Sequence, residues 1–350
     1  MNVAGGRHEG RVNNMDRGGM TKPGSNKPVL DMWQPGQRRI ERANITRFAR
    51  AAIRDWKLRF NDYPSFYRWT IDSPEQFWRS VWQYCGVLGE LRGAPVLADA
   101  HRMPGAKWFP GSRLNFAENL LRRNDDSPAM VFWAANKLRR GVTWSELHDQ
   151  VSRIAQALRA AGVRPGDRVA GYLPNVPEAV AAMLGAVSVG AVWSSCSPDF
   201  GVQGVLDRFG QIEPVVLFVA DGYYYNGKTL DTLEKAGEVA ARLPSVRRVV
   251  VIPYVGEHSN PASIRNGVRL EEFLAPWQPG EIRYERLTFD HPLYIVYSSG
   301  TTGVPKCIVH GAGGTLMKHL VEHQLHMDVK PRDRLFYLTT LGWIMWNWLA

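Results

Sequence analysis

The chain has 350 residues, of which 45% are hydrophobic and 22% are charged, a composition typical of a soluble globular enzyme. No apolar stretch is long enough to span a bilayer, and the basic N-terminus lacks the apolar segment of a secretory signal. The three cysteines, Cys85, Cys196 and Cys307, are far apart and show no CxxC spacing. This pattern disfavours a disulfide framework and a structural zinc site, and it fits a reducing cytoplasm.

The formal net charge of +10 raises the possibility of a nucleic-acid or membrane partner. The basic residues, however, are spread along the chain, and no RNA-binding motif with interleaved aromatic residues is present. We therefore predict a solvated basic surface, no nucleic-acid partner and no membrane span. A small polyanionic ligand would also favour a positive field.

The first 125 residues fall into two segments of different composition. Residues 1–28 are rich in Gly, Asn, Arg and Lys, which predicts a disordered basic tail. Residues 29–125 contain more Trp, Phe and Leu, with apolar residues at helical spacing over residues 45–58. Ser73, Pro74 and Glu75 place a cap, a first-turn proline and an early acidic group before an apolar run, which predicts a helix start. Residues 29–125 are therefore predicted to form a helical N-terminal module.

The pattern becomes regular from residue 126 onward. Thr143 and Glu146 form a capping box, and the helix that they open is predicted to end at Gly162. Strands are predicted at 168–173, 191–195, 215–220, 249–254, 293–297 and 335–339, and helices at 177–189, 201–211 and 230–243. Alternation of strands with helices of this length predicts an α/β fold, built from βαβ units with parallel sheets flanked by helices.

The segment with the most groups able to bind a ligand follows the strand predicted at 293–297. It is the run Tyr297-Ser298-Ser299-Gly300-Thr301-Thr302-Gly303-Val304-Pro305-Lys306. Its glycines permit close backbone approach, successive N–H groups form an anion-binding nest, the hydroxyls donate to phosphate oxygens, and the lysine adds positive charge. The run predicts a phosphate-binding loop, although it is not a Walker A motif, because neither Ser nor Thr follows the lysine. The alternative is a flexible hairpin or linker, which the fixed Pro-Lys end disfavours.

With this run the chain resembles the adenylate-forming superfamily, which includes acyl-CoA synthetases, luciferases and the adenylation domains of peptide synthetases. The resemblance implies that the loop holds the β- and γ-phosphates of ATP while a carboxylate attacks the α-phosphate. Pyrophosphate leaves, and the thiol of CoA then displaces AMP from the acyl-adenylate. ATP, Mg²⁺ and CoA are implied, with catalytic roles for Lys306 and Thr301. The implied nucleotide contacts are Ser298, Ser299, Gly300, Thr301, Thr302, Gly303 and Lys306.

The resemblance covers nearly the whole chain from about residue 30. Segments 108–111 and 114–119 look like the N-terminal module of acetyl-CoA-synthetase relatives, and segments 174–178 and 190–193 continue the match. Two further segments, 193–201 and 340–348, are similar to acetoacetyl-CoA synthetases, which implies acetoacetate as the acid. In this resemblance Trp343, Met345 and Trp346 form an apolar wall, Asn347 donates to a substrate carbonyl, and His310 lines the pocket. The alternative for these side chains is core packing at a helix start.

Members of this superfamily continue for hundreds of residues beyond the position of Ala350. The resemblance therefore implies that residues 126–350 are a truncated AMP-binding domain, that the mobile C-terminal domain is absent, and that the isolated chain is inactive or nearly so. It also implies a cytoplasmic role in lipid metabolism and ketone-body utilisation. The alternatives are an acetyl- or other short-chain acyl-CoA synthetase and, outside enzymes, a truncated nucleotide-binding module. The pattern does not predict an oligomeric state.

Three further sets of residues could carry chemistry. His310, His319, His323 and His326 suggest metal binding, but they lack the H-E-x-x-H order, so we predict packing or solvated histidines and no metal site. Cys196 and Cys307 are predicted to be small buried residues. Residues 223–228 could stack on a base, but their polar setting favours a plain loop before a helix.

Overall fold

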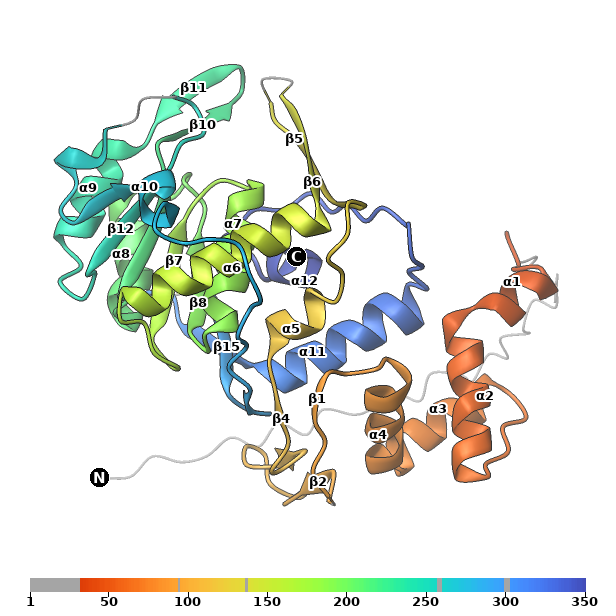
Figure 1. Ribbon diagram of the computed structural model, residues 1–350. Coiled ribbons are helices and arrows are strands. Elements are labelled where there is room, and N and C mark those ends of the chain that lie inside the picture. The colour runs from red at the N-terminus through yellow and green to blue at the C-terminus, as the bar shows by residue number, and fades with distance from the viewer. Residues whose placement is uncertain (1–31, 94, 136–137, 257–259, 299–302) are drawn as a thin grey trace, which may run out of the picture.

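The computed structural model describes residues 32–93, 95–135, 138–256, 260–298 and 303–350. A seven-stranded sheet forms the centre of the α/β region (Figure 1). Its order is β13 (Gly267–Arg269), β12 (Arg248–Ile252), β9 (Val216–Ala220), β7 (Arg168–Tyr172), β8 (Val192–Cys196), β15 (Pro292–Tyr297) and β16 (Cys307–Gly311). All neighbours are parallel except β15 and β16, which pair antiparallel at one edge. The predicted α/β fold with parallel strands is confirmed.

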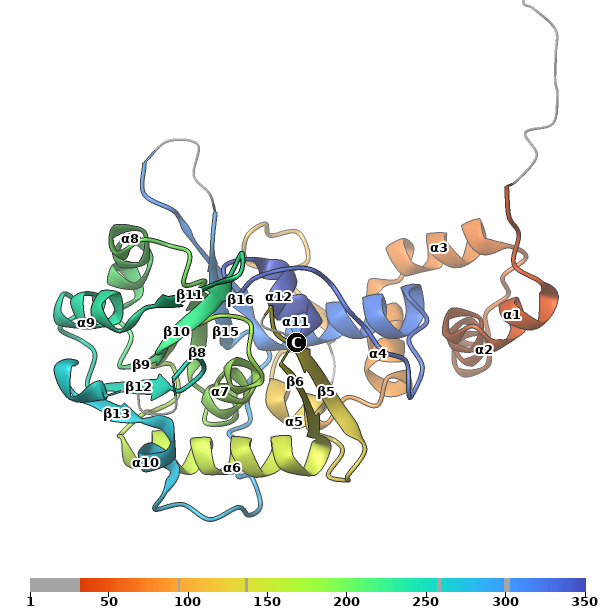
Figure 2. The same cartoon turned by 90° about the horizontal axis from the view of Figure 1, so that it is seen from above.

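Helices cover both faces of this sheet. One face carries α6 (Trp144–Ala160), α7 (Pro177–Ser188) and α10 (Leu270–Leu274), and the other carries α8 (Val202–Ile212) and α9 (Leu233–Ala241). Figure 2 shows α8 and α9 on the opposite side of the strands from α6. Because side chains alternate along a strand, Val216 and Phe218 of β9 enter one core while Leu217 and Val219 enter the other. Burial on both faces explains why these strands are continuous apolar runs.

The start of α6 shows how local sequence determines an element. Thr143 Oγ1 accepts a hydrogen bond from the Glu146 backbone N–H at 3.1 Å, and Glu146 Oε2 accepts one from the Thr143 N–H at 2.8 Å. These two bonds form the predicted capping box and satisfy backbone donors that the first turn leaves unpaired. The helix ends at Ala160, and Gly162 follows with φ of +78°, a conformation that favours glycine.

Two predicted elements differ from the structure. Residues 223–228 do not form a plain loop but belong to a hairpin of β10 (Gly222–Tyr225) and β11 (Lys228–Asp231), so α9 begins only at Leu233. Asn226 and Gly227 have φ of +46° and +73°, as a two-residue hairpin turn requires. Residues 335–339 pair with no strand within the described ranges, and Phe336 and Leu338 are 82% and 86% exposed. A run of β-forming residues becomes a strand only where a partner strand is available.

The N-terminal region contains four helices between residues 37 and 84. Its helices are α1 (Gln37–Arg42), α2 (Asn44–Trp56), α3 (Tyr63–Asp72) and α4 (Pro74–Tyr84). Phe48 is fully buried, and its ring lies 6.2 Å from Phe66 and 5.9 Å from Phe77 in edge-to-face arrangements. Such pairs stabilise a small core beyond their buried area. The predicted tail, residues 1–28, lies outside the described residues.

Short strands and buried asparagines link this module to the sheet region. The strands are β1 (Gly89–Glu90), β2 (Leu97–Ala98), β3 (Lys107–Trp108), β4 (Arg113–Leu114) and β14 (Leu287–Thr288), with β1, β4 and β14 in one sheet and β2 pairing with β3. Asn115, 3% exposed, precedes α5 (Phe116–Leu120). Its Nδ2 donates to the carbonyls of Val187, Ser188 and Glu285 at 3.0, 3.3 and 2.8 Å. This side chain therefore joins segments that are far apart in sequence.

The remaining elements complete the chain. They are the hairpin of β5 (Pro128–Trp133) and β6 (Arg139–Thr143), the 3₁₀ turn Pro261–Ser263, α11 (Ala312–Leu320), the π-helical turn Val321–His326 and α12 (Ile344–Leu349). Asn44 of α2 donates from its backbone to Asp328 Oδ1 at 2.6 Å and from its side chain to the Gln324 carbonyl at 2.8 Å, so the N-terminal module also contacts the end of the π-helical turn. None of the helices in the described ranges is long and apolar enough to cross a membrane.

Candidate functional site

The predicted phosphate-binding loop connects β15 to the edge strand β16. The Ser298 backbone N–H donates to the Lys306 carbonyl at 3.0 Å, and the Lys306 N–H donates to Ser298 Oγ at 3.3 Å. Ser299, Gly300, Thr301 and Thr302 lie outside the described residues. Gly303 has φ of +90°, which accounts for a glycine there. The loop thus connects two antiparallel strands, and its two ends are joined by hydrogen bonds.

The loop opens at the carboxyl edge of the sheet. Strands β7, β8 and β15 are parallel, so the segments that follow Tyr172, Cys196 and Tyr297 all begin at this edge. In open α/β sheets, ligands bind in the crevice outside the carboxyl ends of the strands. Tyr297 is held at this edge because Ser194 Oγ donates to its hydroxyl oxygen at 2.9 Å. Burial raises the pKa of Tyr297, so this hydroxyl stays protonated.

Segment 340–348 packs against the same edge. Ser195 Oγ donates to the Leu341 carbonyl at 2.8 Å, and Trp346 Nε1 donates to Asn175 Oδ1 at 3.0 Å. A Cβ at Gly342 would lie 2.9 Å from the Phe200 ring, so only glycine allows this approach. Segment 340–348, which is far away in sequence, therefore forms one structural unit with segments 174–178 and 193–201 at the carboxyl edge.

The four predicted acyl-pocket residues of segment 340–348 do not share one surface. Trp346 and Asn347 are each 2% exposed, Met345 is half-buried, and Trp343 is 61% exposed. Trp343 precedes the first turn of α12, while Trp346 points back toward β7 through its bond to Asn175. Trp346 and Asn347 thus line the interior, whereas Trp343 faces outward.

His310 lies away from the carboxyl edge. Because β16 runs antiparallel to β15, His310 pairs opposite Tyr294 in the middle of that strand, with the two rings 5.2 Å apart. Burial and then the positive charge of Lys318 lower the pKa of His310, which favours its neutral form. The sheet register therefore does not bring His310 beside the ends of the phosphate-binding loop.

His319 and His323 belong to a packed cluster. Their rings are 5.7 Å apart, and His323 lies edge-to-face against Trp348 at 4.6 Å. Glu322 accepts a hydrogen bond from Trp348 Nε1 at 2.8 Å and pairs with Lys318 at 2.7 Å. Among the described residues, no group of three or more His, Cys, Asp or Glu could hold a metal ion.

The sequence did not predict a role for several residues that the structure places near the carboxyl edge. On α8, Arg208 stacks over Phe200, and Gln211 donates to the Pro305 carbonyl. Asp221, which follows β9 and is 2% exposed, accepts hydrogen bonds from three consecutive backbone N–H groups, those of residues 254–256. The only signal for Arg208 and Gln211 is their spacing of three, which places both on one face of a helix.

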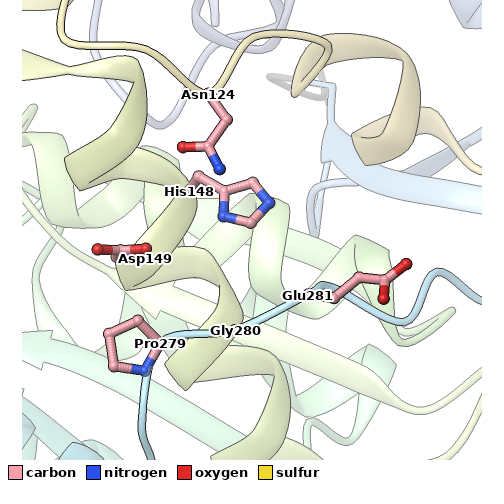
Figure 3. Close-up of a pocket in the computed structure, with 6 residues that line it drawn as sticks. All are labelled: Asn124, His148, Asp149, Pro279, Gly280 and Glu281. Carbon is pink, nitrogen blue, oxygen red and sulfur yellow. The ribbon is translucent and has the colours of Figure 1, made fainter.

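A separate hollow of about 380 Å³ lies on the α6 face, on the other side of the sheet from α8. It is lined by Asn124, His148, Asp149, Pro279, Gly280 and Glu281. Figure 3 shows the Asn124 amide beside the His148 ring, with the carboxylates of Asp149 and Glu281 standing apart on either side. These polar groups do not converge on one point, so the hollow does not replace the carboxyl edge as the candidate site.

Comparison with known proteins decides the family. A family model described as AMP-binding enzyme matches residues 116–349, which include the phosphate-binding loop and segment 340–348. The chain belongs to the AMP-binding enzyme family. A second model, the acetyl-coenzyme A synthetase N-terminus, matches residues 63–120 of the helical module.

Individual members of the AMP-binding enzyme family are similar over most of the chain. Acetoacetyl-coenzyme A synthetase of Rhizobium meliloti (strain 1021) is 50% identical over 320 residues, covering 91% of this chain and 49% of the relative. The acetoacetyl-CoA synthetase of Danio rerio is 45% identical over 327 residues, covering 91% and 48%. A solved structure, acetoacetyl-CoA synthetase from Streptomyces lividans, matches with a TM-score of 0.85 at 46% identity, covering 91% and 49%. The chain therefore spans about half the length of the relatives it matches.

Proposed function

We propose that this chain belongs to an ATP-dependent ligase that joins acetoacetate to CoA through an acyl-adenylate and releases AMP and pyrophosphate. The observation that carries the proposal is the contact of segments 193–201 and 340–348 at the carboxyl edge, beside the loop that ends in Lys306. Relatives that are 45–50% identical over 91% of this chain are named acetoacetyl-CoA synthetases, which supports acetoacetate as the acid. The domain division that we propose is a helical module over residues 29–125 and an AMP-binding domain from residue 126.

The chemistry assigned to the loop is charge neutralisation and positioning. The β- and γ-phosphates of ATP would accept hydrogen bonds from the backbone and hydroxyl groups of Ser298, Ser299, Gly300, Thr301, Thr302 and Gly303. The exposed Lys306 ammonium would stabilise the charge that develops as pyrophosphate leaves. Trp346 and Asn347 are the interior residues best placed beside the acyl group, with His310, Trp343 and Met345 as the further pocket residues of the proposal.

Mg²⁺ would arrive with ATP and supply further positive charge to its phosphates. CoA is the proposed acyl acceptor. The use of cysteine, with Cys85 and Cys196 buried as free thiols, supports a reducing cytoplasm as the location.

The test is ATP–pyrophosphate exchange by the complete gene product with acetoacetate, acetate or butyrate as the acid. We expect exchange to be fastest with acetoacetate. Lys306→Ala should slow it by about 10²–10³-fold, the usual effect of removing one electrostatic stabiliser of a transition state. Lys235→Ala, which removes an exposed lysine of α9, is the matched control and should leave the rate unchanged.

Each component of the proposal can fail separately. A preference for acetate would replace acetoacetate with the short-chain alternative. Unchanged exchange in Lys306→Ala would remove the loop from catalysis. ATP binding without exchange by the complete gene product would favour the non-catalytic nucleotide-binding module.

A further inference from the structure

Gln211, near the end of α8, contacts the exit of the phosphate-binding loop. Its Nε2 donates to the Pro305 carbonyl at 2.8 Å and to the Asp207 carbonyl at 2.5 Å. Its Oε1 accepts from the Cys307 thiol, with a sulfur–oxygen distance of 3.6 Å. Both amide hydrogens and the amide oxygen of Gln211 therefore have hydrogen-bond partners. Pro305 and Cys307 flank Lys306, so one side chain binds the backbone carbonyl before the lysine and the side-chain thiol after it.

The helix that carries Gln211 is itself fixed to the strand before the loop. The Arg208 guanidinium carbon lies 4.4 Å from the centre of the Phe200 ring and 5.7 Å from that of Tyr297, the last residue of β15. Arg208 Nη1 also donates to the Gly204 carbonyl at 2.7 Å. Cation–π contacts of this kind are attractive and stabilise the position of the guanidinium. The position of Gln211 is thus tied to the strand from which the loop starts.

The Cys307 thiol, which donates to Gln211 Oε1, has an environment that keeps it protonated. Cys307 was predicted to be a buried residue, but its side chain is only partly covered, at the start of the edge strand. Burial still raises the pKa of the thiol, so it remains protonated and can donate to Gln211. A thiol is a weak donor, so the stronger restraint on the loop is the bond from Nε2 to Pro305.

A fixed backbone matters for a lysine at this position. Lysine carries its charge on a flexible four-carbon stem, and the Lys306 side chain is exposed. Ordering such a side chain at the moment of reaction lowers the benefit of its charge. Contacts that fix the Lys306 backbone beforehand reduce the number of conformations that the ammonium must lose.

We propose that Gln211 is a positioning residue for the phosphate-binding loop, which holds Pro305 and Cys307 so that Lys306 is presented to the phosphates of ATP. This proposal rests on the proposed function of the loop. Replacing Gln211 should impair the use of ATP but not that of acetoacetate. The hydrogen bonds of Gln211 go to Asp207, Pro305 and Cys307, and none of these residues belongs to segments 174–178, 193–201 or 340–348.

The experiment compares Gln211→Ala with Gln203→Ala in the complete gene product. Gln203 lies on the same helix but contacts Asp207 and Arg242 instead of the loop. Loss of one hydrogen bond of ordinary net strength predicts a fall of about fivefold in kcat/KM for ATP in Gln211→Ala, with KM for acetoacetate and the melting temperature unchanged. Gln203→Ala should match the unmodified protein. Gln211→Glu keeps the acceptor for Cys307 but loses the donor to Pro305, so it should behave like Gln211→Ala.

A second measurement does not depend on catalysis. The Ser298 and Lys306 amides are hydrogen-bonded across the base of the loop, and without nucleotide their hydrogen exchange should be faster in Gln211→Ala than in Gln203→Ala. If the two variants agree in ATP kinetics and exchange while Lys306→Ala abolishes activity, the positioning role is wrong and the function stands. If Lys306→Ala is also without effect, the catalytic role proposed for the loop fails and the positioning role fails with it.

Discussion

Acid should destabilise this protein through His319, a partly buried imidazole of α11. Its ring lies between Phe116 and His323, with ring centroids 6.2 and 5.7 Å away. Burial, followed by the positive charges of His323 and Lys318, lowers the pKa of His319 from its ordinary 6.5 to about 4, and Glu322 only partly opposes this. The folded protein therefore keeps His319 neutral at pH values where the unfolded chain binds a proton.

The direction of the effect follows from proton binding. Between the unfolded and folded pKa values the unfolded state holds more protons, so the free energy of unfolding decreases as the pH falls. The stability is fully present above the unfolded value of 6.5 and is lost as the pH drops through the folded value of about 4. Each pH unit between the two values corresponds to about 1.4 kcal/mol, which gives a limiting loss of roughly 3 kcal/mol. About 2 kcal/mol of this should be lost by about pH 5.

The assay is urea unfolding, followed by tryptophan fluorescence, near neutral pH and about pH 5 at constant ionic strength. His319→Gln should reduce the loss of stability between the two pH values by about 2 kcal/mol. His326→Gln, which changes an exposed histidine of the adjoining π-helical turn, should retain the full loss. The comparison uses the difference between pH values, so an overall destabilisation by either substitution cancels. Equal losses in His319→Gln and the unmodified protein would refute the reasoning.

Two predictions concern packing around the sheet. A Cβ at Gly171 would lie 2.8 Å from the buried Trp193 ring, so Gly171→Ala should lower the free energy of unfolding by about 1–3 kcal/mol. Gly210→Ala meets no atom within 4 Å on α8 and should be neutral or stabilise by up to about 1 kcal/mol in the same urea assay; equal effects of the two would contradict this account. Asn115→Ala removes the amide donor shared by the carbonyls of Val187, Ser188 and Glu285, of which the first two keep a backbone N–H donor, and should cost about 1–3 kcal/mol; a loss below about 0.5 kcal/mol would show that water replaces the amide.

The sequence predicted the central sheet well because its strands are buried on both faces. Strand β9 and residues 249–252 of β12 are continuously apolar, and helix α6 carries clear start and stop residues. Residues 335–339 show the limit of this reasoning, since strand propensity does not say whether a neighbour will pair with the run. For residues 223–228 the missed signal was Asn226-Gly227, which favours a two-residue hairpin turn over a loop.

The candidate site was harder to predict than the fold, because it depends on register and on contacts across long separations. The phosphate-binding loop could be recognised from its residues, but the contacts of Gln211 with Pro305 and Cys307 join residues about a hundred positions apart. The placement of His310 depends on the antiparallel pairing of β16, which only the structure reveals. A sequence pattern gives the chemical type of a side chain, while the sheet decides which edge it reaches.

One aromatic ring links the two halves of the candidate site. Phe200 lies against Gly342 of the segment that leads into α12, and its ring also lies beneath the Arg208 guanidinium, which reaches over Tyr297 at the start of the phosphate-binding loop. A change in the size of residue 200 would therefore alter the packing of the acyl segment and the support of the loop at the same time. This shared contact gives a physical reason why segments 193–201 and 340–348 must fit each other, since neither can be altered in shape at this ring without displacing the other.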